Sequence, residues 1–196
     1  MRIIEDISLE SNVHLLMRER GKLVPGSLRE GHNVFTVNGK NWLSRLISWY
    51  SVGSVDVAYT NRRVRWVGLG SGALLESSTV VSLMTPVLVS PSSYLASVQA
   101  VEFPDSSSVR FIREFGLNEV TIAGIPVMIS EAGLYADVSP ANNGAEEDTS
   151  YDPEVPTGTV LDPTIGTNSV IAYKSFDGLA KTIDFTIEIR WDFRFA

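Results

Sequence analysis

The stretch that decides the fold reads Thr182-Ile183-Asp184-Phe185-Thr186-Ile187-Glu188-Ile189-Arg190-Trp191-Asp192-Phe193-Arg194-Phe195. Every odd-numbered position in it is apolar, and every even-numbered position is polar or charged. Such alternation puts one set of side chains on each face of a β-strand, whereas a helical period of 3.6 would scatter both sets around the axis. At about 3.3 Å per residue, the strand would be roughly 46 Å long. Its core face is predicted to carry Phe185, Ile187, Ile189, Trp191 and Phe193.

Further short segments rich in β-branched and aromatic residues are separated by Gly, Pro and Ser. They lie at residues 63–67, 87–89, 109–115, 119–122, 125–129 and 170–173. Ala123-Gly124 is typical of a tight reversal. Because Pro126 lacks the N–H that a ladder needs, the strand after the reversal is expected to begin there or to lie at an edge. Without regular βαβ alternation, the pattern predicts a mainly β protein, an antiparallel and jelly-roll-like β-sandwich.

Two segments have helical spacing. Residues 38–49 place Trp42, Leu46 and Trp49 on one stripe, which we interpret as packing against the sheet. Residues 9–20 show a weaker periodicity of the same kind. Neither segment is long enough to be stable as an isolated helix, so both would depend on contacts with the sandwich.

A basic, glycine-rich segment at residues 18–31 breaks every period, and we interpret it as an extended arm. Free arms of this kind gain order by lying on a partner. The predicted organisation is therefore a helix and arm for subunit contacts at residues 1–30, followed by a β-sandwich domain at residues 31–196. The predicted contact residues of the arm are Arg18, Arg20, Lys22, Val24 and Arg29.

The chain has 16 basic and 23 acidic residues, a net charge of −7, and they are distributed unevenly. Residues 1–66 carry a net +4, whereas residues 137–168 carry seven acidic residues and no basic one. Turn-forming residues fill that acidic segment, so we predict a long solvated loop that serves a partner contact or solubility. It lacks the spacing of an EF-hand loop, which makes a cation site a weak alternative. The predicted contact residues of the loop are Glu146, Glu147, Asp148, Asp152 and Glu154.

Candidate catalytic residues are sparse. The chain has no cysteine, which excludes disulfides, thiolate metal sites and a cysteine nucleophile. His14 and His32 lie in the predicted arm, away from any acidic cluster, so we expect no histidine-dependent triad or histidine-rich metal site. Paired carboxylates of the glycosidase kind stay open, because their geometry cannot be read from sequence. We expect no enzymatic activity and no cofactor.

One glycine-rich stretch has a spacing that is also found in dinucleotide-binding proteins. Residues 68–73 read Gly-Leu-Gly-Ser-Gly-Ala and match the dinucleotide pattern G-x-G-x-x-G/A after a predicted strand. No acidic residue ends a second strand about 20 positions further on, as a ribose contact would require. Ser71 also lacks the G-x-S-x-G pattern of a nucleophile elbow. We interpret the glycines as a turn that lets the backbone lie close to a neighbour.

The composition argues against a membrane or nucleic acid as a partner. Hydrophobic residues make up 44% of the 196 residues, enough for a core. No stretch of about 18 apolar residues exists, and Glu5 and Asp6 stand where an export signal would have an apolar run, so we expect neither a membrane span nor an export signal. Overall acidity and the lack of a dense basic patch argue against nucleic acid.

Several segments, taken in order, resemble a group of tailed-bacteriophage virion structural proteins. The similar pieces are residues 18–27, residues 29–36 with Gly39 and residues 42–43, residues 67–72, residues 129–135, residues 172–176 with residues 181–182, and the alternating end that finishes at residues 190–195. The resemblance implies a component of the neck, tail, baseplate or fibre attachment and no catalytic residues. It implies contacts with copies of this chain and with other virion proteins, and a place in a particle assembled in the bacterial host cytoplasm.

Alternatives from other classes stay open at this point. A capsid decoration protein would use arms and loops equally well. A carbohydrate- or receptor-binding β module would stack surface aromatics such as Trp66 or Tyr135 on sugar rings. An enzyme would show a pocket of converging, perturbed carboxylates. If the chain is a phage structural subunit, the basic segment of one copy could lie on an acidic face of the next copy and set its orientation.

Overall fold

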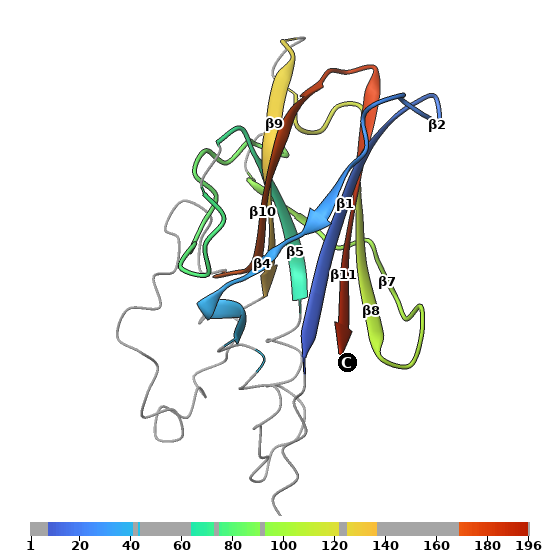
Figure 1. The fold of residues 1–196 in the computed structure, drawn as a ribbon. Helices are drawn as coiled ribbons and strands as arrows, with labels where there is room; N and C mark the ends of the chain where they lie inside the picture. The colour runs from blue at the N-terminus through green and yellow to red at the C-terminus, as the bar shows by residue number, and fades with distance from the viewer. Residues whose placement is uncertain are drawn as a thin grey trace, which may run out of the picture.

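The computed structural model describes residues 8–40, 43, 64–72, 75–90, 93–121, 125–136 and 169–195. In these residues, eleven β-strands form two antiparallel sheets that pack face to face as a sandwich (Figure 1). The predicted fold class is thus confirmed. None of the helices in this part of the chain is long and apolar enough to cross a membrane.

The first sheet, called sheet A below, has the strand order β2-β1-β11-β8-β7, and β3 pairs with the same side of β1 as β2 does. Its centre is the pair β1–β11, in which eleven residues of each strand face one another in unbroken register from Leu9↔Phe195 to Glu19↔Phe185. The bounds are β1 Leu9–Glu19, β2 Lys22–Leu23, β3 Arg29–His32, β7 Ala100–Glu102, β8 Ser108–Phe115 and β11 Phe185–Phe195.

The second sheet, sheet B, has the order β4-β10-β9-β5-β6. Here β9 is central and pairs with both β10 and β5. The chain crosses between the sheets at both sides, from β3 to β4 through Asn33 and from β6 to β7 through Val98 and Gln99. The bounds are β4 Val34–Phe35, β5 Val64–Gly70, β6 Leu95–Ser97, β9 Val127–Ala136 and β10 Ser169–Lys181.

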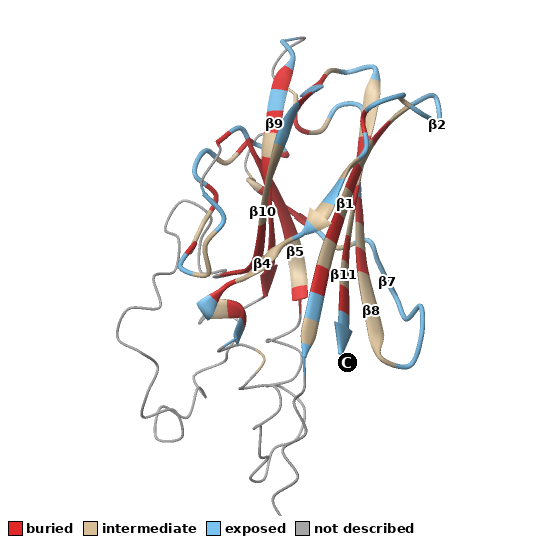
Figure 2. Cartoon of the chain, viewed as in Figure 1, coloured by how far each residue is buried: buried red, intermediate tan, exposed pale blue. Residues whose placement is uncertain are grey.

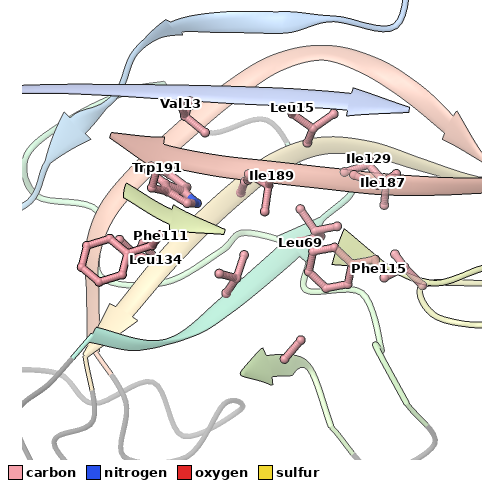
Figure 3. Packing of buried hydrophobic residues seen from close by; sticks show 14 of the residues in the cluster. Val13, Leu15, Leu69, Phe111, Phe115, Ile129, Leu134, Ile187, Ile189 and Trp191 are labelled. Carbon is pink, nitrogen blue, oxygen red and sulfur yellow. The ribbon is translucent and has the colours of Figure 1, made fainter. Parts of the chain in front are cut away.

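The main core lies between the two sheets. Val13 and Leu15 of β1 and the apolar side chains of β11 point toward Leu69 of β5 and toward Ile129 and Leu134 of β9 (Figure 3). On β11 the predicted alternation is borne out as burial, because the polar residues between the core residues are only partly buried. Four of the five predicted core residues are buried: Ile187, Ile189, Trp191 and Phe193. The fifth, Phe185, is partly buried and packs against the same cluster.

A second, smaller core covers the outer face of sheet B. Val80 and Leu83, from the segment between β5 and β6, pack with Tyr135 of β9 and with Val170 and Tyr173 of β10. As a result, β9 is buried on both faces over Glu131–Ala136, whereas β1 and β11 are buried on one face (Figure 2). Sheet A is therefore the sheet with a free outer face among the described residues.

The predicted helix at residues 9–20 is wrong, since this segment is strand β1. Its buried residues alternate (Ser11, Val13, Leu15 and Met17), but the partly buried Leu16 on the other face creates an apparent helical spacing. Pairing along the whole of β11 supplies the partner that an isolated segment lacks. The sequence around Arg20 and Gly21 makes a tight reversal into β2, and both residues have positive φ, 50° and 79°, as a type I′ hairpin turn requires.

The predicted division at residue 30 is also wrong for the described part of the chain. Strands β1, β2 and β3 lie in the same sheet as β11 and β8, so residues 9–32 form part of the sandwich and not a free arm. The turn between β2 and β3 is fixed by Ser27, which is buried: its Oγ donates to the Val24 carbonyl oxygen at 2.7 Å and accepts from the Met17 amide at 3.1 Å. The composition of residues 18–31 predicted a free arm, but this segment is a folded part of sheet A.

Other strand boundaries differ in detail. The alternating stretch begins as a strand at Phe185, because Ile183 lies in the turn from β10 and is 50% exposed. No strand forms over residues 119–121, where buried Val120 has a φ of 56°. Residues 87–89 form no strand either, although the segment bonds to β5 through Val87 N and the Leu69 carbonyl at 2.9 Å. Of the two expectations for Pro126, the strand start is confirmed, since β9 begins at Val127 and is central.

A helical turn begins at Val37 and is held by Thr36, which is fully buried. The Thr36 hydroxyl accepts from the Gly39 amide at 3.0 Å and donates to the Val170 carbonyl at 2.7 Å, so it caps the turn and ties it to β10. This confirms a helical start near the predicted position. The stripe Trp42, Leu46 and Trp49 lies outside the described residues, so its predicted packing stays a prediction.

Candidate interaction surfaces

The free outer face of sheet A is a network of ion pairs that runs across strands. At its centre, Arg110 of β8 donates from Nε and Nη2 to the two carboxylate oxygens of Asp192 on β11, at 2.6 and 3.1 Å. This hydrogen bond raises the pKa of Arg110. Glu102 of β7 lies 3.7 Å from the same guanidinium, between Oε2 and Nη1. The carboxylate of Asp192 is thus already paired within the sheet.

His14 joins this network, which corrects the expectation that both histidines lie away from acidic groups. Its Nδ1 is 3.4 Å from Glu30 Oε2, and its Nε2 is 3.5 Å from Asp192 Oδ2. The two carboxylates address opposite nitrogens of the ring and do not converge on one point. Among the described residues, no group of three or more acidic or histidine side chains could hold a metal ion.

A second group on this face contains one of the predicted arm residues. Arg18 Nε of β1 is 3.4 Å from Glu188 Oε2 on β11, and Arg190 also pairs with Glu188. All three side chains are partly exposed, so each pair contributes little to stability. Several charged side chains on the outer face of sheet A are therefore paired with neighbours in the same sheet.

The remaining arm residues lie around the β1–β2 and β2–β3 turns. Val24 is partly buried against the main core, and Arg29 Nε donates to the Asp177 carbonyl at 3.1 Å, which joins β3 to β10. Arg20 and Lys22 are exposed at the β1–β2 hairpin and make no ion pair with another described residue. Of the five predicted contact residues, these two are the ones whose charges stay available to a partner. The acidic-loop residues Glu146, Glu147, Asp148, Asp152 and Glu154 lie outside the described residues.

The glycine-rich turn at the end of β5 surrounds a carboxylate of the chain itself. Glu131 of β9 is fully buried, and its Oε1 accepts from the amides of Gly72 at 3.2 Å and Thr85 at 2.8 Å. Its Oε2 accepts from the Met84 amide at 3.0 Å and from the Tyr173 hydroxyl at 2.9 Å. Backbone amides that could cradle a phosphate in another protein here bind an internal anion.

Close approach explains why glycines stand at this turn. A Cβ on Gly70 would lie 2.3 Å from Glu131 Oε1, and a Cβ on Gly72 would lie 2.6 Å from Met84 Cβ. These separations are shorter than non-bonded atoms allow. The interpretation of the motif as a close backbone approach is confirmed, and sequence reasoning missed Glu131 because nothing in the spacing links it to residues 59 positions earlier.

One buried amine stands at the opposite end of β10. Lys181 is fully buried, and its Nζ donates to the carbonyl oxygens of Leu117 at 3.1 Å and Thr182 at 2.7 Å. Burial lowers the pKa of Lys181 to about 8, opposed by the charges of Glu119 and Asp184. Because both hydrogen-bond partners are backbone carbonyls, the side chain fastens the β8–β9 connection to the β10–β11 turn.

Exposed apolar side chains gather at this same end of the sandwich, which we call the hairpin end. Ile183 lies in the β10–β11 turn, Leu117 supplies a carbonyl to Lys181, and Met128 faces Ala180 across the β9–β10 ladder. The hairpin end is defined by these and two further residues that are between 46% and 63% exposed: Leu23, Leu117, Ile125, Met128 and Ile183. Soluble monomers rarely expose large apolar patches, which more often mark contact sites.

The aromatic residues named for sugar stacking are not displayed at the surface. Tyr135 is fully buried in the small core of sheet B, which contradicts its prediction as a surface aromatic. Trp66 is partly buried, and the Arg65 guanidinium lies 4.9 Å from the centre of its ring. The Tyr135 ring is thus not accessible to a sugar, and Arg65 lies over the ring of Trp66.

Comparison of the chain with protein families, with curated proteins and with solved structures found no match.

Proposed function

We propose that this chain is a non-enzymatic structural subunit of a tailed-phage particle, assembled as a symmetric oligomer in the neck or tail region. The observation that carries the proposal is the set of apolar side chains left exposed at the hairpin end of the described sandwich, beside a sheet face on which several charges are paired with neighbours in the same sheet. The sequence resemblance described above points to the same class. A subunit copied around an axis must present surfaces for its neighbours, and apolar patches rimmed by polar groups are such surfaces.

The hairpin end also has charges that could orient a neighbour. Arg20 and Lys22 stand beside Leu23 on one side of it, and Asp184 stands in the turn with Ile183 on the other. Opposite charges at the border of an apolar contact fix orientation and register more than they add affinity. This retains the proposed contact through the basic segment, but as part of the folded sandwich.

The test of the proposal is the location of the chain in particles. Antibodies raised against the purified protein should label one region of phage particles produced from the genome that encodes it, and a cryo-electron microscopy reconstruction should show symmetry-related copies there. Labelling spread over the head would favour a capsid decoration protein instead. Particles that lack the chain, or a purified protein that turns over a substrate, would contradict the proposal.

A variant links the hairpin end to this function. Ile183→Asp and Met128→Asp together should prevent incorporation into particles while the far-ultraviolet circular dichroism of the purified protein stays unchanged, because both side chains are half-exposed. Thr182→Asp provides a matched control, since it adds a carboxylate in the same turn without removing an apolar side chain.

A further inference from the structure

The outer edge of sheet A at β7 is open in the described part of the chain. Strand β7 pairs with β8 on one side, and no described strand pairs with its other side. All three of its residues are exposed. Val101 is 47% exposed and Phe103, directly after the strand, is 75% exposed. The edge therefore combines unpaired main-chain groups with uncovered apolar side chains.

Other sheet edges in the described residues have features that limit strand addition. At the far side of sheet A, β2 is two residues long and contains Lys22, and β3 continues directly into β4 of sheet B. In β6, an edge strand of sheet B, Leu95 is buried in the small core and Ala96 in the main core. Lysines, short edges and coverage are the usual devices against strand addition. Apart from its short length, β7 has none of them.

We propose that β7 is a docking edge for β7 of a second copy of this chain, paired antiparallel about a two-fold axis at Val101. The proposal rests on the assembly function proposed above and names one of its contacts. In this register Val101 faces Val101 of the partner subunit, Ala100 faces Glu102 of the partner subunit, and Gln99 faces Phe103 of the partner subunit. The two sheets would then continue as one across the axis.

The charge pattern accommodates a second copy of β7 in this register and disfavours the neighbouring register. Centred on Val101, the pairing opposes no two like charges, and each Glu102 keeps Arg110 of its own chain as a neighbour. Centred one residue later, the two Glu102 carboxylates would face each other directly, which is unfavourable. Val101 lies opposite the buried Phe111 of β8, so a second Val101 alongside would extend the core beneath the edge. A two-fold axis makes every such contact occur twice.

Substitutions at Ala100 test the register, because the pairing puts this residue opposite Glu102 of the partner subunit. Ala100→Glu should weaken self-association about tenfold, since two symmetry-related pairs of like charge form, and Ala100→Lys should strengthen it by a similar factor. The double variant Ala100→Glu with Glu102→Lys should restore the association. Sedimentation velocity over a range of concentrations measures each effect. Ser106→Glu is the control, because it adds the same charge at an exposed position outside the strand.

Cysteine cross-linking gives a second readout, since the chain has no cysteine of its own. Paired residues on opposite strands place their Cβ atoms about 4.5–5.5 Å apart, so Val101→Cys should form a disulfide between two copies under mild oxidation, and Ser106→Cys should not. Equal association of the Ala100→Glu and Ala100→Lys variants, or oligomers in which Val101→Cys stays reduced, would overturn the edge pairing. Neither result would touch the particle labelling, which tests the proposed function separately.

Discussion

The two sheets of this protein bury their residues in different ways. Among the described residues, sheet A has one face on the core and one outer face with polar and charged side chains, so its central strand β11 alternates. Sheet B is covered on both faces, because the segment between β5 and β6 packs on its outer side, and β9 is buried without alternation over Glu131–Ala136. A strand's sequence pattern thus reflects how many of its faces are covered, and not only that it is a strand.

The two sheets are therefore expected to differ in how much their polar contacts contribute to the stability of the fold. The covered face of sheet B depends on one buried carboxylate, Glu131, that four donors satisfy. The open face of sheet A depends on partly exposed pairs that are individually weak. Substitutions that remove the covered contacts should therefore cost more than those that remove the open ones, and the following four measurements test that order.

The largest effect is expected in the core that the two sheets share. Trp191→Ala should lower the free energy of unfolding by about 3–5 kcal/mol, because Trp191 is fully buried and its removal leaves a cavity. Urea denaturation followed by circular dichroism measures the change. A loss below 1 kcal/mol would show that β11 does not pack as described.

The second largest effect is expected at Glu131, the buried carboxylate of sheet B. Glu131→Ala should cost about 2–4 kcal/mol, because the amides of Gly72, Met84 and Thr85 lose their acceptor. Amide hydrogen exchange should accelerate at Met84 and Thr85 while the β1–β11 amides keep their protection in native conditions. Tyr173→Phe is the matched control and should cost about 1 kcal/mol, since it removes one of the four hydrogen bonds. Equal protection of residues 84 and 85 in the wild type and in Glu131→Ala would show that Glu131 does not hold this segment on sheet B.

A smaller effect depends on pH at the buried amine. With the pKa of Lys181 lowered to about 8 in the folded state, against 10.5 when exposed, both states are protonated below pH 8. Between about pH 8 and 10.5 the unfolded state holds more protons, so this residue makes the free energy of unfolding rise with pH, by at most about 1.4 kcal/mol per pH unit. Measured as a difference from Lys181→Met, which has no titrating amine, the rise should appear in that window. A flat difference would mean that the amine titrates normally.

The smallest effect belongs to the open face of sheet A. Glu188→Gln should change the free energy of unfolding by less than about 1 kcal/mol, because the pairs with Arg18 and Arg190 are partly exposed. High salt should reduce even this difference. Chemical denaturation in 50 mM and 1 M salt gives the measurement, and a cost as large as that of Glu131→Ala would remove the distinction between the two sheets.

Several features could be predicted from the sequence because they are local. Alternation over Phe185–Phe195 requires only the period of a strand, and the glycines at residues 68–72 indicate a close approach whatever lies opposite. Pro126 predicts a strand start because proline lacks the N–H group that a β-ladder needs, which is also a local property. Each of these inferences uses the geometry of a few consecutive residues.

Other features needed partners from distant parts of the chain. The helix expected at residues 9–20 is a strand because eleven residues of β11 pair with it, across more than 160 positions of sequence. His14 reaches acidic groups because β3 and β11 flank its strand. The basic composition of residues 18–31 indicated an arm, but hydrogen bonds through Ser27 and Arg29 hold it to the sandwich.

The amino-acid sequence by itself determined that this protein is a β-sandwich, which strand carries its core, and where its backbone must come close to a neighbour. Only the tertiary structure decided what that neighbour is, the carboxylate of Glu131, and which sheet face, end and edge are uncovered by the described residues. The physical reason is that periodicity depends on neighbouring residues, whereas burial, ion pairing and an unpaired edge depend on which distant strands meet.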